Sequence, residues 1–322
     1  MSAPSNNSLS ADVPVGSGIP IGSIVALITP MFEDGQVDHA CLEKLVDWHV
    51  SCGTAAIVAV GTTGESATLT VTEHCEVIER VVKSARGRMP VIAGTGANST
   101  AEAIELTESA ARSGAQACLS VTPYYNKPTQ EGLYLHHKAI AEAVAIPNIL
   151  YNVPGRTAVD MLPETTARLA EVDNIVGIKD ATGDLARARA LLQQCPRQFA
   201  IYSGDDATAA ELMMLGGKGD ISVTANVKPA EIALLCQLSM AVGTEIDGET
   251  VTAEMVRELN QALMPVHDAM FVEANPIPVK WAAYQMDLCA KGIRLPMTEL
   301  SAEHRAQVEK AIALDIALPI PA

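Results

Sequence analysis

The sequence predicts an α/β protein, a (β/α)8 TIM barrel followed by a C-terminal helical extension. Three observations lead to this fold class: eight short apolar runs recur along the chain, segments with helical spacing separate them, and the chain has 322 residues. A barrel of this kind takes about 250 residues. The remaining length therefore suits one extension better than a second large domain.

The eight apolar runs have the length and composition of strands buried on both faces. Because strands and helices alternate strictly, we expect right-handed βαβ units in a parallel sheet, and eight such units favour closure. The expected strands are residues 23–28, 56–60, 89–93, 117–121, 148–151, 175–179, 199–202 and 219–223.

The segments between the runs carry helix start and stop signals. Thr70 and Glu73 form a capping box before an apolar stripe at residues 77, 78, 81, 82 and 85, and Gly87 is the expected stop. Ser99 starts the next helix in the same way, and Gly114 is its expected end.

An open, doubly wound sheet is the alternative to a closed barrel. Its dinucleotide-binding form needs G-x-G-x-x-G directly after the first strand. Here Thr29-Pro30-Met31-Phe32 follows the first expected strand, and the Gly-Thr-Gly at residues 94–96 follows the third strand without a third glycine. The closed barrel is therefore the favoured topology.

The chain divides into three expected regions. Residues 1–18 are rich in Ser, Asn, Pro and Gly and predict a flexible N-terminal extension, and residues 19–243 hold the barrel with its active site. Residues 244–322 predict helices alone, at 251–270, 278–286 and 301–315.

Composition limits the partners and the compartment. A net charge of −16 argues against nucleic acid, although local donors can still hold a small anion. No apolar run approaches the ~20 residues that span a bilayer, and no cationic region precedes an apolar stretch at the start. The seven cysteines include no C-x-x-C pair, which is typical of reduced thiols. We expect a cytoplasmic protein without a membrane partner.

Lys179 is the most informative single residue, because a barrel of this kind has its active site at the carboxyl ends of the strands. It ends the run Ile-Val-Gly-Ile at residues 175–178. Apolar surroundings disfavour a charged ammonium, and the neutral amine attacks carbonyl carbons. The alternative is a structural lysine that extends to solvent or pairs with Asp180. The pattern alone leaves both open.

Tyrosines gather at the same ends of the strands. The chain has six tyrosines, and Tyr124, Tyr125 and Tyr151 all fall there. A phenol beside a Schiff-base lysine can transfer protons, but these rings could also only fill the rim. Adjacent side chains point differently, so at most one of Tyr124 and Tyr125 is expected at the reacting centre.

Two further segments could bind carboxylates. Thr62 and Thr63 lie in a glycine-flanked turn with hydroxyls and closely spaced N–H groups, although such a turn is often only a turn. Arg156 has the planar fork that suits a carboxylate, and a surface salt bridge is its alternative. Neither a metal nor a cofactor is expected: no H-x-x-x-H occurs, and the adjacent His136 and His137 must diverge on a helix.

These segments together resemble the dihydrodipicolinate synthase family of the N-acetylneuraminate lyase superfamily, from about residue 22 to residue 300. The matching segments are residues 61–66, 121–128, 151–157, 177–180, 202–206 and 275–280. The resemblance implies Schiff-base condensation of pyruvate with L-aspartate 4-semialdehyde to 4-hydroxy-tetrahydrodipicolinate, a lyase step in diaminopimelate and lysine biosynthesis. It also implies a homotetramer built as a dimer of dimers.

The resemblance also assigns roles to single residues. Lys179 would form the imine, and Tyr151 would move protons, linked through Thr62 to Tyr125 from a neighbouring subunit. Thr63 would hold the carboxylate of pyruvate and Arg156 that of the semialdehyde. The residues expected to line the pocket are Gly204 and Ile221.

Feedback by L-lysine is a further implication. The inhibitory site of the family corresponds to Ser66, Ala67, His74, Asn98, Glu102 and Tyr124. Val71 stands where sensitive members often have a histidine, so we expect weak inhibition. One alternative function is another pyruvate-dependent lyase of the superfamily, acting on sialic acid or 2-keto-3-deoxy sugar acids. The Gly-Arg-Thr at residues 155–157 argues against it. Another is a carboxylate-binding barrel without turnover, against which the intact lysine and tyrosines argue.

Overall fold

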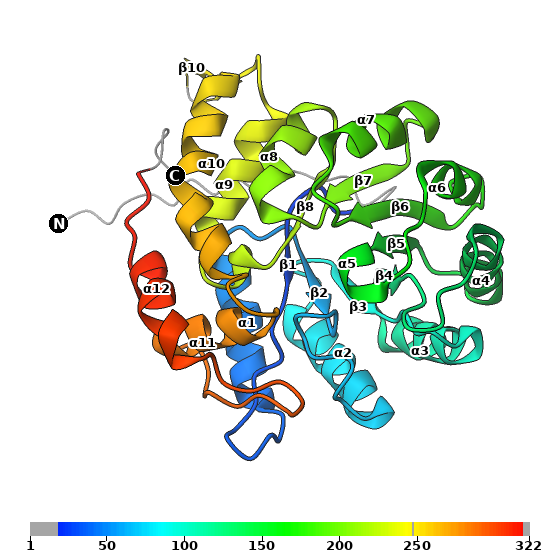
Figure 1. Cartoon of the computed structure of the whole chain (residues 1–322), viewed down its shortest axis with the longest axis horizontal. Coiled ribbons are helices and arrows are strands. Elements are labelled where there is room, and N and C mark those ends of the chain that lie inside the picture. The colour runs from blue at the N-terminus through cyan, green and yellow to red at the C-terminus, as the bar shows by residue number, and fades with distance from the viewer. Residues whose placement is uncertain (1–18, 247, 318–322) are drawn as a thin grey trace.

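Eight parallel strands close into a barrel in the computed structural model of this chain (Figure 1). The structure describes residues 19–246 and 248–317, so the extension predicted at residues 1–18 lies outside the described residues, as do residues 247 and 318–322 of the C-terminal region. Each strand pairs with the next and β8 pairs with β1, which confirms the predicted (β/α)8 barrel. The strands are β1 (Gly22–Ala26), β2 (Ala56–Ala59), β3 (Val91–Gly94), β4 (Ala117–Val121), β5 (Asn148–Asn152), β6 (Ile175–Asp180), β7 (Ala200–Ser203) and β8 (Gly219–Ser222).

Helices form the outer layer around the barrel and continue beyond it at the C-terminal end (Figure 1). They are α1 (His39–Ser51), α2 (Val71–Ala85), α3 (Thr100–Ser113), α4 (Gln130–Ala143), α5 (Pro154–Thr157), α6 (Pro163–Leu169), α7 (Leu185–Gln194), α8 (Asp206–Met214), the 3-10 helix η1 (Thr224–Asn226), α9 (Pro229–Met240), α10 (Ala253–Ala269), α11 (Ile277–Gln285) and α12 (Ala302–Ile312).

The core has an inner and an outer layer because side chains alternate along each strand. In β1, Ile24 and Ala26 pack inside the barrel, and Val25 between them packs against the helices. The inner layer is closed by large side chains such as Ile149 and Ile221. Burial of one such side chain contributes about 1.5–3 kcal/mol. The barrel is therefore a filled core, and its polar groups are left at the strand ends.

The predicted helix signals hold with one change. The Thr70–Glu73 capping box is complete, and the Ser99 side chain accepts from the backbone N–H of Glu102. The helix after Ser99 ends at Gly114, which has a φ of 88°. The helix after Thr70 ends one residue earlier than expected, because Arg86 already adopts the left-handed conformation with a φ of 50°.

The C-terminal region begins with a short strand pair, which the expectation of helices alone missed. The strands β9 (Glu245–Ile246) and β10 (Glu249–Thr250) pair antiparallel, and Gly248 between them has a φ of 85°. Beyond them α10 packs against α8, α9 and α12, and α11 packs against α12. The extension thus lies along one side of the barrel (Figure 1). Across the described ranges, no helix combines the length and apolarity needed to span a membrane.

Candidate active site

Lys179 lies near the carboxyl end of β6 and points into the barrel. Its backbone is in register with Tyr151 on β5 and Tyr202 on β7. The lysine is only 5% exposed, and its Nζ lies 4.5 Å from the centroid of the Tyr151 ring. It therefore does not extend to solvent. It does not pair with Asp180 either, because that carboxylate binds Arg187 on the outer side of the strand.

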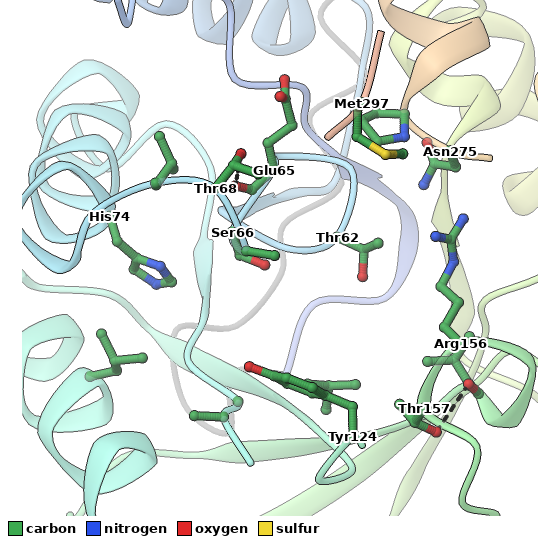
Figure 2. A pocket seen from close by; sticks show the side chains of 18 of the residues that line it. Thr62, Glu65, Ser66, Thr68, His74, Tyr124, Arg156, Thr157, Asn275 and Met297 are labelled. Atoms are coloured by element: carbon green, nitrogen blue, oxygen red, sulfur yellow. Dashed lines mark hydrogen bonds between the residues drawn. The ribbon is translucent and has the colours of Figure 1, made fainter. Parts of the chain in front are cut away.

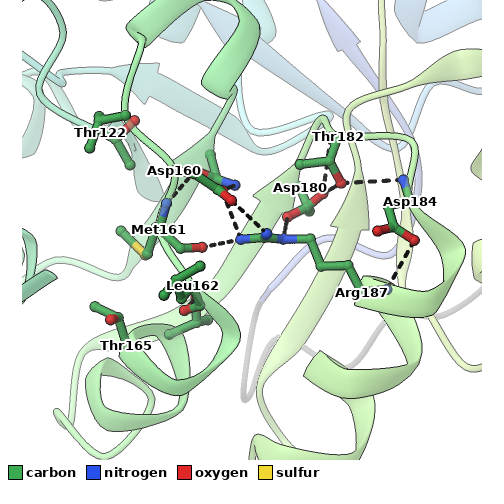
Figure 3. A network of polar contacts seen from close by, with 12 residues as sticks. Thr122, Asp160, Met161, Leu162, Thr165, Asp180, Thr182, Asp184 and Arg187 are labelled. Atoms are coloured by element: carbon green, nitrogen blue, oxygen red, sulfur yellow. Dashed lines mark hydrogen bonds and ion pairs between the residues drawn. The ribbon is translucent and has the colours of Figure 1, made fainter. Parts of the chain in front are cut away.

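A polar network behind the sheet holds the ends of β5 and β6 together (Figure 3). Arg187 Nε donates to Asp180 Oδ2 at 2.8 Å, and Arg187 Nη1 donates to Asp160 Oδ2 at 3.0 Å. Asn152 Nδ2 donates to Asp160 Oδ1 at 2.9 Å. Asn152 and Asp180 follow Tyr151 and Lys179 by one residue, so strand alternation places them on the opposite face. The network therefore sets the register of the tyrosine and the lysine.

Close packing shapes the space around the lysine. Gly204 leaves room for it, since a Cβ at that position would lie 2.6 Å from Lys179 Cε. Ile221 is fully buried in the same inner cluster as Tyr151 and Tyr202. The Tyr202 hydroxyl donates to the carbonyl of Pro20 at 2.8 Å, and burial raises its pKa. Of the two inner tyrosines, only Tyr202 has its hydroxyl engaged within the described part of the chain.

The Thr62–Thr63 turn presents hydrogen-bond donors at the end of β2. Thr63 is 2% exposed, and its Oγ1 accepts from Asn275 Nδ2 at 2.9 Å. Gly64 and Glu65 donate their N–H groups back into the turn, to Gly61 and Thr62. Within residues 19–246 and 248–317, the N–H groups of Thr62 and Thr63 have no such acceptor. Free, adjacent N–H groups are suited to binding a carboxylate.

A cavity of about 520 Å³ opens over these strand ends (Figure 2). One side is formed by Thr62, Arg156, Thr157 and Asn275. Arg156 comes from the short helix α5 and extends its guanidinium toward Asn275 and Met297 (Figure 2). The rest of the lining includes five of the six residues predicted for the L-lysine-binding site: Ser66, Ala67, His74, Glu102 and Tyr124.

On the side of the cavity predicted to bind L-lysine, the polar side chains have defined partners. His74 Nε2–H donates to the Gly94 carbonyl at 2.7 Å, and burial lowers the pKa of the ring. Burial raises the pKa of Tyr124, and the neighbouring Glu102 adds to this shift. Asn98 does not line the cavity but donates to the Tyr124 carbonyl at 3.1 Å. It therefore supports the loop that carries Tyr124.

Of the predicted catalytic residues, Thr62 lines this cavity, Tyr151 lines a small pocket that also contains Thr62, and Lys179 lines neither.

Tyr125 is the predicted catalytic residue that the chain turns outward. It is 89% exposed and has a φ of 74°, while its neighbour Tyr124 lines the cavity. Asn126 Nδ2 donates to the Asn98 carbonyl at 2.8 Å, which holds this loop in place. The Tyr125 ring is thus presented outward on an ordered turn.

Two residues of the C-terminal extension reach the site and were not assigned a role from the sequence. Asn275 binds Thr63, and Lys280 binds Glu65 and the carbonyl of Thr29. Their segment, residues 275–280, was one of the matching segments of the resemblance, which was the available signal. No group of three or more potential metal-ligating side chains occurs in the portion of the chain that the structure covers.

Comparisons with known proteins agree on one family. A model of the dihydrodipicolinate synthetase family matches residues 20–314. The 4-hydroxy-tetrahydrodipicolinate synthase of Cellvibrio japonicus is 64% identical over 293 residues, which cover 91% of this chain and 98% of that protein. The relation thus extends over nearly the whole length of both chains.

Solved structures give the same result. The dihydrodipicolinate synthase of Acinetobacter baumannii, complexed with pyruvate, is 54% identical with a TM-score of 0.87, and the match covers 91% of this chain and 98% of that one. The enzyme of Cyanidioschyzon merolae with lysine bound is 38% identical with a TM-score of 0.84, covering 91% and 97%. The chain belongs to the dihydrodipicolinate synthetase family.

Proposed function

We propose that this protein condenses pyruvate with L-aspartate 4-semialdehyde to 4-hydroxy-tetrahydrodipicolinate, a lyase step of diaminopimelate and lysine biosynthesis. The observation that carries the proposal is the buried Lys179, whose Nζ lies 4.5 Å from the Tyr151 ring at the carboxyl end of the barrel. Relatives at 60–64% identity bear the name of this enzyme, which supports the substrate assignment.

Pyruvate enters first in this mechanism. Lys179 Nζ adds to the carbonyl carbon of pyruvate, and the carbinolamine loses water to give the imine. Tyr151 is the proton donor and acceptor for that loss, because its ring lies directly against the amine. The Thr63 hydroxyl and the free N–H groups of the turn hold the pyruvate carboxylate.

The semialdehyde enters through the cavity. Loss of a methyl proton turns the imine into an enamine, whose carbon forms the new bond with the aldehyde carbon of the semialdehyde. Arg156 binds the semialdehyde carboxylate, since its planar fork matches two carboxylate oxygens. The amino group of the product then displaces Lys179 from the imine carbon and closes the ring, which frees the lysine.

The assembly and the compartment belong to the same proposal. A homotetramer, built as a dimer of dimers, places Tyr125 of one subunit at the cavity of another, and the 89% exposure of this ring supports that role. All seven cysteines are free, as in proteins of a reducing compartment, so we place the enzyme in the cytoplasm.

Borohydride trapping tests the catalytic assignment. Reduction in the presence of pyruvate should add a stable adduct to the peptide that contains Lys179, and Lys179→Ala should abolish both adduct and activity. Lys138→Ala on the surface of α4 is the control and should behave as wild type. An adduct on another residue, or none, would contradict the mechanism. Turnover of sialic acid or 2-keto-3-deoxygluconate instead of the semialdehyde would favour the alternative lyases.

Inhibition by L-lysine is a prediction of its own. Lysine should inhibit weakly, because Val71 contributes no polar group to the cavity wall. Glu102→Gln should weaken inhibition further, since it removes the carboxylate that would pair with the lysine ammonium, whereas Val71→His should strengthen it. The measurement is the initial rate against lysine concentration. Full activity of the wild type and of Val71→His at saturating lysine would refute the site.

A further inference from the structure

We propose that Asn275 is a positioning residue for pyruvate: its carboxamide fixes the direction of the Thr63 hydroxyl, so that the hydroxyl proton is left for the substrate carboxylate. This inference rests on the proposed function, since it concerns how the same site binds pyruvate. The pair joins the turn after β2 to the C-terminal extension, 212 positions apart in sequence.

The argument starts from the hydrogen-bonding capacity of a hydroxyl. A threonine hydroxyl has one proton to donate and two lone pairs that accept. Asn275 Nδ2 donates to Thr63 Oγ1 at 2.9 Å, which occupies one lone pair and directs the proton elsewhere. Among the residues that the structure describes, no atom accepts this proton. A carboxylate at the neighbouring N–H groups of Thr62 and Thr63 would be its acceptor.

Burial makes this arrangement strong. Thr63 and Asn275 are 2% and 5% exposed, so water does not compete for their donors and acceptors. A hydroxyl that turns freely would satisfy a carboxylate only part of the time. One that is already directed donates to the carboxylate without further ordering.

Asn275 itself is held firmly. Lys280 follows Asn275 in the same segment. It forms a buried ion pair with Glu65 and donates to the Thr29 carbonyl, which anchors the segment in the core. The carboxamide therefore approaches Thr63 from a fixed direction. Its Oδ1 has no partner inside the described ranges, and the residue also lines the cavity into which Arg156 extends (Figure 2).

Asn275→Asp tests the polarity of the contact. The substitution keeps the shape of the side chain but replaces the donor with an acceptor, so the Thr63 proton would turn toward residue 275 and away from the substrate. The pyruvate concentration for half-maximal borohydride trapping on Lys179 should rise about 10- to 100-fold, as expected for a lost hydrogen bond to a charged group. The KM for pyruvate should rise with it, and kcat at saturating pyruvate should change much less.

Thr63→Val separates this effect from simple charge repulsion. Without the hydroxyl there is no proton to direct, so Asn275→Asp should cost far less pyruvate affinity in the Thr63→Val protein than in the wild type. Repulsion by the new carboxylate would persist in both backgrounds. If Asn275→Asp does not fold, the same cycle is run with Asn275→Ala, which removes the donor without adding a charge.

Asn260→Asp is the matched control. Asn260 lies on α10 and donates its Nδ2 to the Ala207 carbonyl at 3.1 Å, and its Oδ1 also has no partner among the residues that the structure describes. Its substitution should leave the KM for pyruvate unchanged. The inference alone would be overturned if Asn275→Asp kept the pyruvate affinity of the wild type. It would also be overturned if Asn275→Asp lowered pyruvate affinity equally in the wild-type and Thr63→Val proteins. Failure of the wild type to trap pyruvate on Lys179 would overturn the proposed function and this inference with it.

Discussion

The geometry of the candidate site depends on single residues that pack around Lys179. Lys179 is surrounded by the Tyr151 ring, by the backbone of Gly204 and by the apolar interior of the barrel. These contacts leave the amine little freedom to move, which suits the proposed attack on a carbonyl carbon from one direction. The geometry is tight enough that a single methyl group matters.

Gly204→Ala should inactivate the enzyme without unfolding it. The new Cβ would lie 2.6 Å from Lys179 Cε and 2.8 Å from the Cβ of Ala181, so the lysine must move. A displacement of about 1 Å at a reacting group can lower kcat/KM by roughly 100-fold. Steady-state kinetics measures the loss of activity, and circular dichroism shows whether the variant is folded. As control, the Cβ of Gly155→Ala would meet no atom of the described part of the chain within 4 Å, so this variant should keep the local fold. Wild-type kcat/KM in Gly204→Ala would contradict the packing argument.

A second residue-scale feature lies between β8 and the helices. Asp220 is 1% exposed, and its Oδ1 has no partner among the described residues. The nearby Asp206 carboxylate already accepts from the N–H groups of Val223 and Thr224. Burial, and then the Asp206 charge, raise the pKa of Asp220 well above its ordinary value. Asp220 is therefore a buried carboxyl whose neutral form is favoured.

Asp220→Asn should remove part of the dependence of stability on pH. The folded protein retains the Asp220 proton at pH values where the unfolded chain has lost it, above a pKa of about 3.9. Stability therefore falls as pH rises from there toward the raised folded pKa, by at most about 1.4 kcal/mol per pH unit. An asparagine cannot ionise, so the stability of the variant relative to the wild type should increase as pH rises. Urea unfolding at one protein concentration, from pH 5 to pH 9, measures the difference; parallel curves would refute it.

At the scale of elements, the turn between β2 and α2 is held by the C-terminal extension. Glu65 in this turn has a φ of 58°, a conformation that is costly for a residue with a side chain. Its carboxylate binds Lys280 and also the backbone N–H of Arg294 at 3.1 Å. Burial lowers the pKa of Lys280, and the Glu65 charge opposes that shift. The turn that carries Thr62 and Thr63 thus depends on a segment that follows the barrel.

Lys280→Met should destabilise the protein strongly. It leaves the Glu65 carboxylate buried without its ion-pair partner, and loss of one member of a buried pair costs about 3–5 kcal/mol. The free energy of urea unfolding measures the loss. Lys83→Met is the control, because its pair with Glu79 is exposed and screened by solvent, so its loss should change the free energy of unfolding little. Equal effects of the two substitutions would show that the buried pair does not anchor the turn.

At the scale of the whole molecule, the chain brings most of the predicted site residues to one end of the barrel, with Tyr125 turned away from them. The cavity is lined by residues of several barrel loops and of the extension, while Tyr125 lies outside on an ordered turn. An exposed aromatic ring beside an active-site cavity is suited to a contact between subunits. The assembly should therefore complete the site.

Mixing two inactive variants tests this completion. Lys179→Ala lacks the nucleophile, and Tyr125→Phe lacks the hydroxyl offered to the neighbouring subunit. A dimer with one subunit of each contains one intact site, made from Lys179 of one subunit and Tyr125 of the other. After co-refolding at equal amounts, about a quarter of wild-type activity should appear, because half of the dimers are mixed and each has one of two sites intact. Activity no higher than the average of the separate variants would show that Tyr125 acts within its own chain.

Much of the architecture follows from local patterns in the sequence. Eight apolar runs, the capping box at Thr70 and the stop at Gly114 depend on neighbouring residues, so composition and spacing are enough to predict them. The same holds for the position of Lys179, because a lysine that ends an apolar strand must stand at the active rim of a barrel. The short strands β9 and β10 were missed because two-residue strands carry no periodicity.

Only the tertiary structure decided which residues far apart in the chain contact one another. The sequence left two readings of Lys179 open: a catalytic nucleophile, or a structural lysine that extends to solvent or pairs with Asp180. The structure shows a buried lysine, with Asp180 bound to Arg187. The contact of Asn275 with Thr63 joins residues 212 positions apart. Local periodicity holds no information about such pairs, since they depend on how the closed barrel and its extension pack together.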